Sequence, residues 1–267
     1  MAENKEIRVE TWSELNDVLY EGSWHEPLRR FRSTFAYRGA PDRCFELRPS
    51  LARLGEIAGD LETHMLRSFR KYAHHQAVPS DSVWHWLALA QHHGLPTRML
   101  DWTYSPYVAL HFVTEHMHCY DRDGVIWRVD YARTNQALPA RLRAILEEEG
   151  PAVQVFTAEM LARAARSLED FDALADEAFM LFFEPPSLDE RIVNQYALFS
   201  LVSRMQVDLA NWLSSHEQAL STIIIPAALK WEIRDKLDQA NITERVLYPG
   251  LDGLSQWLKR YYTPRAE

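Results

Sequence analysis

The sequence predicts an α+β fold with a mixed, mainly antiparallel central sheet of about six short strands flanked by helices. Short runs rich in β-branched and aromatic residues are scattered among segments with helical periodicity. These strands and helices do not alternate regularly, which argues against a βαβ series. The chain has 9 glycines in 267 residues, and no Gly/Ser-rich or Pro-rich linker divides it. We therefore expect one domain over residues 1–267.

Helices are predicted where apolar residues recur every three or four positions between recognisable ends. Thr11 with Glu14 forms a capping-box pattern, Ser82 and Ser105 are suitable N-caps, and Gly94 suits a helix C-terminus. The predicted helices are 11–19, 55–75, 82–93, 105–115, most of 139–177 with a break at Gly150-Pro151, 227–240 and 251–261. The region of about 139–177 is expected to be a helical insertion.

Strands are predicted where β-branched and aromatic residues cluster between turn residues. Ile223, Ile224 and Ile225 form a fully apolar run, which is typical of a strand buried on both faces. The predicted strands are 35–38, 125–130, 178–183, 196–202, 222–225 and 245–248.

Composition limits the class of protein. A net charge of -9 argues against a protein that coats nucleic acid by charge alone. Cys44 and Cys119 provide no disulfide framework and no zinc spacing. The first residues lack an apolar signal region, and no run approaches the roughly 18 apolar residues of a membrane helix. These features predict a cytoplasmic protein without a membrane segment.

The segment from Gln91 to Thr103 is unusually dense in groups that bind or titrate. His92 and His93 can act as bases, proton donors or ligands near neutral pH. Arg98 and Asp101 lie three residues apart and can bond each other or one partner, and Trp102 could stack on a planar ring. The alternative is a polar network that closes a helix end. We predict a functional site here, because loops disproportionately carry sites.

Tyr37-Arg38-Gly39 is a second candidate, at the end of a predicted strand. An arginine there can bind phosphate or carboxylate in a bidentate manner, and a glycine permits close backbone approach. The alternative is an arginine paired with a buried carboxylate beside a glycine that only turns the chain.

The segment from Glu190 to Ser200 is a third candidate, because a helix end runs into a strand there. Arg191, Asn194 and Gln195 would lie at the mouth of that strand, where they could face a ligand. The alternative is that they satisfy the free carbonyl groups of the helix C-terminus.

Metal and nucleophile motifs are weak. His111, Glu115 and His118 share a helical face, but HExxH is absent, and a solvated helix face is the simpler interpretation. Ser105 lacks a G-x-S-x-G setting, and the chain has no P-loop and no G-x-G-x-x-G. No metal is expected.

Together, these segments resemble the FRG domain family, named for its Phe/Tyr-Arg-Gly pattern. The resemblance covers about residues 30–258. Ala197 stands where the family's later R-I-x-x-Q-x-G-x-F pattern has glycine. The matching segments are Tyr37-Arg38-Gly39, Leu47 to Arg53, Trp86 to Thr103, Ser105 to Phe112, Arg191 to Phe199 and Tyr248 to Leu254.

A weaker resemblance links the chain to arginine ADP-ribosyltransferases of the R-S-E type. They too have an aromatic-Arg-Gly strand, then a Ser/Thr strand leading into a helix, then a catalytic glutamate. Here Thr103 to Phe112 is similar to the second element, with a Ser105-to-Ala109 spacing one residue shorter. Gln195 stands near the third and is neutral, so Glu190, Glu184 or Asp101 would have to supply the charge.

This resemblance implies a domain that binds NAD or a related nucleotide. It implies transfer of ADP-ribose or hydrolysis of NAD, in a toxin or phage-defence effector. The implied catalytic residues are His92, His93, Asp101, Gln195 and Glu190. The implied cofactor-binding residues are Tyr37, Arg38, Gly39, Arg98, Trp102, Thr103, Tyr104, Ser105 and Arg191.

The alternative function is a non-catalytic sensor or recognition module that binds nucleic acid or a protein partner. Arg32, Arg43, Arg48 and Arg53 could give it a local basic patch despite the acidic total charge. A third option is a metal-dependent nuclease or hydrolase. Convergence of the motif residues into one deep pocket would favour a small ligand, and a flat scatter would favour a macromolecule.

Overall fold

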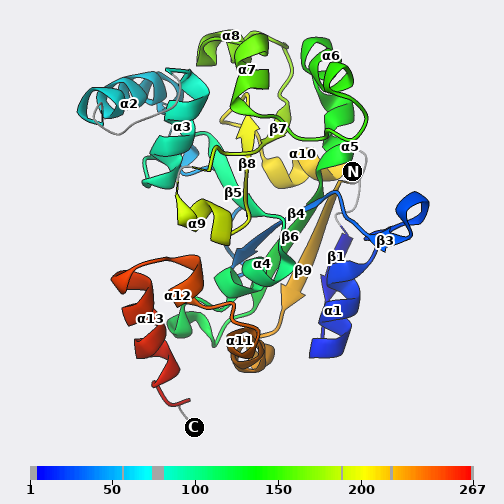
Figure 1. The fold of residues 1–267 in the computed structure, drawn as a ribbon, viewed down its shortest axis with the longest axis vertical. Helices are drawn as coiled ribbons and strands as arrows, with labels where there is room; N and C mark the ends of the chain where they lie inside the picture. The colour runs from blue at the N-terminus through cyan, green and yellow to red at the C-terminus, as the bar shows by residue number, and fades with distance from the viewer. Residues whose placement is uncertain (1–4, 56, 74–80, 188, 217–218, 266–267) are drawn as a thin grey trace.

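The computed structural model of the protein describes residues 5–55, 57–73, 81–187, 189–216 and 219–265. A seven-stranded sheet crosses the molecule in the order β1-β9-β6-β4-β5-β8-β7 (Figure 1). Edge strand β1 pairs in parallel with β9, and the other neighbouring pairs are antiparallel. The strands are β1 (Lys5–Arg8), β4 (Phe35–Ala40), β5 (Met99–Thr103), β6 (Gly124–Asp130), β7 (Met180–Phe183), β8 (Ala197–Val202) and β9 (Leu220–Ile225). The predicted α+β class with a mixed, mainly antiparallel sheet is confirmed.

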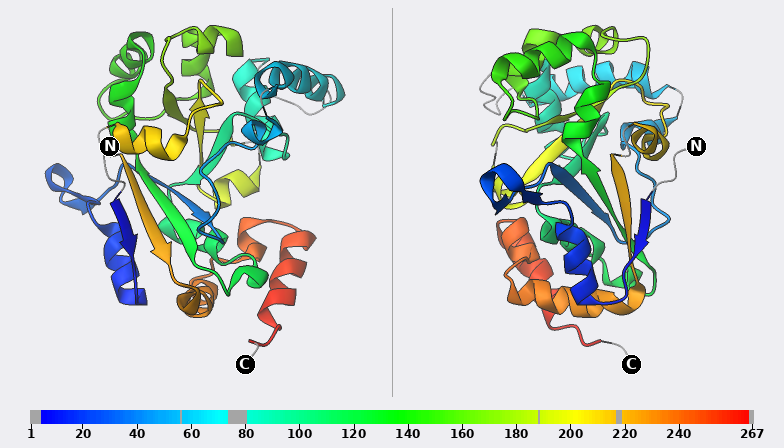
Figure 2. Two further views of the ribbon diagram at one scale, coloured as in Figure 1. Left: turned by 180° about the vertical axis from the view of Figure 1, so that it is seen from behind. Right: turned by 90° about the vertical axis from the view of Figure 1, so that its right-hand side faces the viewer.

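Helices surround this sheet. The helices are α1 (Trp12–Tyr20), α2 (Ala58–Tyr72), α3 (Val83–His92), α4 (Pro106–Val113), α5 (Tyr131–Thr134), α6 (Ala140–Glu149), α7 (Ala158–Ala164), α8 (Leu168–Asp172), α9 (Glu190–Asn194), α10 (Leu209–Ser215), α11 (Lys230–Gln239), α12 (Glu244–Leu247) and α13 (Leu251–Tyr261). Helices α6, α7 and α8 lie at one end of the molecule and α13 at the other (Figure 2). A separate hairpin of β2 (Trp24–His25) and β3 (Arg30–Phe31) projects from the side. Among the described residues, no helix has both the length and the apolar character needed to cross a membrane.

Side-chain oxygens cap the N-termini of three helices at the positions that the sequence predicts. Thr11 accepts a bond from the backbone N–H of Glu14, Ser82 caps α3, and Ser105 caps α4. Gly94 follows α3 with φ +80°, the left-handed conformation that favours glycine after a helix end. The predicted N-caps and this helix end are confirmed.

Two predictions about elements are wrong, and a third lies partly outside the described residues. Residues 245–248 were expected to form a strand, but Glu244–Leu247 is helix α12, packed against α13 through the Arg260–Glu244 ion pair. Residues 99–103 were treated as part of a loop and form strand β5. The helix predicted over 55–75 is α2, and residues 74–75 lie outside the described residues.

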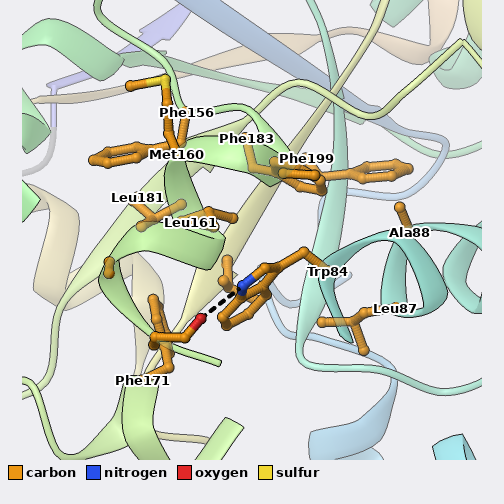
Figure 3. Close-up of a cluster of buried hydrophobic side chains, with 14 of the residues drawn as sticks. Trp84, Leu87, Ala88, Phe156, Met160, Leu161, Phe171, Leu181, Phe183 and Phe199 are labelled. Carbon is orange, nitrogen blue, oxygen red and sulfur yellow. Dashed lines mark hydrogen bonds between the residues drawn. The ribbon is translucent and has the colours of Figure 1, made fainter. Parts of the chain in front are cut away.

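One face of the sheet carries two separate apolar clusters. The first covers β5, β7 and β8 and is built around aromatic rings from α3, α8, β7 and β8, with Met160 and Leu161 of α7 packed against them (Figure 3). Trp84 is buried at its centre, and its indole N–H donates to the carbonyl oxygen of Ala165 at 3.0 Å. The second covers β4, β6 and β9 under α1, α4 and α11. The opposite face of the sheet packs a third cluster, which includes Leu100 and Trp102.

Strand alternation places polar groups between the first two clusters. Met99 belongs to the first cluster, and Tyr37 belongs to the second. Between them on the same face, Asp101 pairs with Phe199 and Thr103 pairs with both Ala197 and Tyr37. The gap between the two clusters therefore opens onto β5.

Candidate functional site

A pocket of about 680 Å³ occupies this gap, with α3 on one side and α9 on the other. Figure 1 shows α9 between α3 and α12, in front of β5 and β8. The lining of the pocket comes from segments far apart in the chain, including all three candidate motifs. The lining residues are Tyr37, Arg38, Gly39, Ser50, Gln91, His92, His93, Gly94, Leu95, Asp101, Trp102, Thr103, Phe112, Arg191, Ile192, Gln195, Ala197 and Phe199.

The carboxylate of Asp101 is held from α3. The side-chain amide of Gln91 donates to both carboxylate oxygens at 3.0 Å. The Gln91 oxygen in turn accepts the Thr97 hydroxyl at 2.5 Å, which fixes the amide's orientation. Asp101 is nevertheless 59% exposed, so its carboxylate is available to a ligand in the pocket.

Arg38 links strands β4 and β5 where their backbone pairing ends. β4 and β5 share one register pair, Tyr37 with Thr103. Beyond that pair, Nη1 of Arg38 donates to the backbone oxygen of Asp101 at 2.5 Å and lies 3.9 Å from its carboxylate. Burial lowers the pKa of Arg38 below its usual value, and Asp101 opposes this shift. The guanidinium therefore serves as a support for β5 and as part of the pocket wall.

The other two residues of the Tyr-Arg-Gly motif have structural contacts. Burial raises the pKa of Tyr37 to about 12, so its hydroxyl stays protonated and donates to the carbonyl oxygen of Leu19 at 2.9 Å. A Cβ at Gly39 would lie 2.0 Å from the backbone oxygen of Ala109. Glycine is required here because α4 crosses β4 at this point. The motif thus combines packing with pocket lining.

The two histidines of α3 differ in their surroundings. Nε2 of His92 forms a short hydrogen bond with Oδ2 of Asp189. Asp189 also caps α9 by accepting from the backbone N–H of Ile192 at 3.1 Å. His92 therefore links the end of α3 to the start of α9 across the pocket. His93 is exposed at the pocket edge, with its ring centroid 5.2 Å from that of His92.

The opposite wall is formed by α9. The side-chain amides of Asn194 and Gln195 donate to the carbonyl oxygens of Val246 and Leu247, at 2.8 and 3.1 Å. The Gln195 carbonyl accepts the Thr103 hydroxyl at 2.7 Å. Gln195 therefore orients the wall through both its amide and its backbone. These side chains were expected to satisfy free carbonyl groups at a helix C-terminus. They do bond such carbonyl groups, which belong to α12.

Arg191 lines the same wall. Its guanidinium carbon lies 4.9 Å from the ring centre of Tyr248, and its buried Nε has no hydrogen-bond partner among the described residues. The Tyr248 hydroxyl donates to Oε1 of Glu115 at 2.9 Å, which holds the ring in place. Glu190 precedes Arg191, is exposed, and lies outside the pocket lining.

Arg98 is buried away from the pocket. Its Nε lies 2.6 Å from Glu62 of α2, and its Nη1 lies 2.5 Å from Asp172 of α8. Burial raises the pKa of the Glu62 carboxyl above its usual value, and the Arg98 guanidinium opposes this rise. Arg98 thus joins two helices to the start of β5, and the structure does not bring it to the pocket.

The aromatic and hydroxyl residues after Asp101 are mostly held by the protein. The Trp102 indole is 3% exposed and donates to Ser200 at 2.9 Å. Tyr104 lies outside the lining and donates to Glu184 at 2.8 Å, and its burial beside this carboxylate raises its pKa far above the usual value. Ser105 caps α4 and does not line the pocket.

Several residues of this region were absent from the sequence-based set, and three of them make contacts that shape the pocket. Gln91 binds Asp101, Asp189 binds His92, and Phe112 adds an apolar surface. Asp189 could have been noticed as an N-cap before the predicted helix end. Among the described residues, no group of three or more His, Cys, Asp and Glu side chains could hold a metal ion. His111 is buried against Arg234, and Glu115 binds Tyr248.

Residues 33–122 match the family model described as the FRG domain. This span contains β4, α3, β5 and α4, which build most of the pocket, whereas α9 and β8 lie beyond it. No curated protein and no solved structure matches the chain. Residues 33–122 are therefore similar to the FRG domain family.

Proposed function

We propose that the pocket binds NAD or a related nucleotide. The observation that carries this proposal is the convergence of three distant segments on one cavity of about 680 Å³. That volume lies within the range of small-molecule and cofactor sites. Small-ligand binding is favoured over a flat contact with a macromolecule for the same reason.

The lining suits a nucleotide chemically. Arg191 and His93 can donate to phosphate oxygens, and Arg38 adds a positive charge to the lining. Leu95, Phe112 and other apolar residues offer a surface for a base or nicotinamide ring. Asp101 can accept hydrogen bonds from ribose hydroxyl groups. Each part of the ligand would have a matching group.

Catalysis is the second part of the proposal, and Asp101 is the residue to test. Asp101 is the carboxylate among the residues that line the pocket, because Glu190 lies outside the lining and the Gln195 side chain is neutral. In NAD hydrolysis, water attacks the anomeric carbon and the bond to nicotinamide breaks. Nicotinamide leaves as a neutral molecule and one proton is released. A carboxylate beside the ribose would stabilise the positive charge that develops. A toxin or phage-defence role would follow from such NAD consumption.

The experiment combines a thermal shift with NAD and an assay of nicotinamide release. We expect NAD to raise the melting temperature of wild type and of Asp101→Asn, since the amide keeps the shape of the carboxylate. We expect release from wild type and at least a 100-fold lower rate from the variant, the order of loss when a group stabilising transition-state charge is removed. Absence of both shift and release in wild type would refute binding and catalysis together.

Recognition of nucleic acid or a protein by the basic patch is less well supported. Arg43 lies 3.7 Å from Glu6, and Arg48 lies 3.8 Å from Glu46, so carboxylates offset both charges. Arg32 and Arg53 are exposed on separate segments. Salt-dependent retardation of labelled oligonucleotides in a gel would support recognition of nucleic acid.

A further inference from the structure

The arginines near the pocket differ in how their donors are used. Arg98 bonds two carboxylates, and Arg38 bonds the Asp101 carbonyl oxygen. Arg191 lines the pocket, yet no hydrogen bond or ion pair with another described residue occupies its guanidinium. Its contact is with the face of the Tyr248 ring. A guanidinium in this condition has donors left for a ligand.

Leaving such donors unused inside a protein is unfavourable. A buried N–H without a partner loses its bonds to water and gains nothing in return. The Nε of Arg191 is in this state. That atom is shielded from the cavity, so an anion in the pocket would bind the terminal nitrogens of the same guanidinium, which also have no hydrogen bond to another described residue.

The surroundings also fix where Arg191 lies. Ile192 is buried, and Asn194 and Gln195 are bonded to α12, so α9 has little freedom to turn. The Tyr248 ring, held by Glu115, supports the guanidinium from one side. Positioned donors bind anions with less loss of conformational entropy than a mobile side chain.

We propose that Arg191 binds the phosphate groups of the ligand and that Arg38 is a positioning residue for β5. The ligand is then a nucleotide with at least one phosphate, oriented with its phosphates toward α9 and a ribose toward Asp101. This inference rests on the proposed function, and it names the substrate class as phosphorylated ribonucleosides.

The test is a titration by calorimetry with ADP-ribose, adenosine and inorganic pyrophosphate. Wild type should bind ADP-ribose more tightly than adenosine. Arg191→Met should weaken ADP-ribose by about 10- to 100-fold, the value of a lost charge-assisted bond, and leave adenosine unchanged. The affinity of Arg191→Lys for ADP-ribose should lie between those of wild type and Arg191→Met, because lysine keeps the charge without the planar donor pair. Arg143→Met, an exposed arginine of α6, is the control for net charge and should match wild type.

Arg38→Met separates the two arginines. As a positioning residue, Arg38 should affect ADP-ribose and adenosine by the same factor, because its loss displaces β5 for both. A larger loss for ADP-ribose alone would make Arg38 the phosphate group and overturn the inference.

The outcomes separate the two proposals. If wild type binds neither ADP-ribose nor adenosine, the proposed function fails and the inference fails with it. If wild type binds both and Arg191→Met keeps full affinity for ADP-ribose, or loses both ligands equally, the inference alone is overturned. Pyrophosphate binding as tight as that of ADP-ribose would show a simple anion site and overturn the nucleoside assignment.

Discussion

The two walls of the pocket differ in how far their polar groups are bonded within the protein. The block wall, residues 91–103, holds Asp101 through Gln91 and buries Arg98 between Glu62 and Asp172. The α9 wall, residues 190–195, is fixed through Asn194 and Gln195 but leaves the Arg191 guanidinium without a hydrogen bond among the described residues.

A high density of polar residues in a sequence therefore does not identify the groups that bind a ligand. The block wall has more polar residues, yet most of their bonding capacity is used to hold β5 between α2, α3 and α8. The α9 wall has few, and one of them, Arg191, lines the cavity with a guanidinium that has no hydrogen bond to another described residue. The two walls should therefore respond differently to mutation, the first in stability and the second in binding.

The largest expected effect is on the block wall. Arg98→Ala should lower the free energy of unfolding by about 3–5 kcal/mol, because it leaves the buried Glu62 carboxylate without its partner. Urea unfolding followed by circular dichroism measures this. Arg163→Ala, which breaks exposed ion pairs with Glu148 and Glu149, is the control and should change stability by at most about 1 kcal/mol. Equal losses in the two variants would show that the Arg98 cluster contributes no more than surface charge.

A smaller effect is expected where β4 meets α4. Gly39→Ala should destabilise the protein by about 1–3 kcal/mol, because its Cβ would overlap the Ala109 carbonyl and force α4 outward. Gly59→Ala is the matched control: it lies exposed in α2 with open space at its Cβ, and it should stabilise by about 0.5–1 kcal/mol. Thermal unfolding of both variants measures the difference, and a neutral Gly39→Ala would mean that α4 yields easily.

The sequence predicts the regular parts of this architecture well. Thr11, Ser82 and Ser105 mark helix starts because a cap is a local interaction that depends on one side chain and its neighbours in the chain. Strand β5 escaped prediction for a local reason as well. Leu100 and Trp102 on one face are apolar, but Met99, Asp101 and Thr103 on the other face mix apolar and polar side chains, so no clean alternation marks the strand.

The site was predicted in its segments but not in its contacts. Tyr37 to Gly39, His92, Asp101 and Arg191 line one pocket. The partners of Arg98 come from α2 and α8, far away in the chain, so no spacing rule reveals them. Helix α12 formed for a similar reason, since Glu244 pairs with the distant Arg260.

Behind the α9 wall, a buried histidine should make stability depend on pH. Burial next to Arg234 holds the pKa of His111 well below 6.5. Because arginine only donates, Nδ1 of His111 must accept its bond at 2.9 Å, and the ring is neutral. As pH falls below about 6.5, the unfolded chain takes up a proton that the folded protein resists, so stability falls by up to about 1.4 kcal/mol per pH unit.

His111→Asn removes this titration while keeping an acceptor for Arg234. Urea unfolding at pH 7.5, 6.5 and 5.5 should show wild type losing about 1 kcal/mol more than the variant between the last two values. Parallel curves for the two proteins would contradict a depressed pKa at His111.

The smallest change in stability is expected on the α9 wall. Arg191→Met should change the free energy of unfolding by less than about 1 kcal/mol. The methionine keeps an apolar stem against Tyr248, and the variant loses a cation–π contact of about 0.5–1 kcal/mol while removing an N–H that was buried without a partner. Chemical denaturation of Arg191→Met and Arg98→Ala under the same conditions compares their free energies of unfolding. A loss of several kcal/mol at Arg191 would mean that its donors already stabilise the folded protein, and the two walls would then be alike.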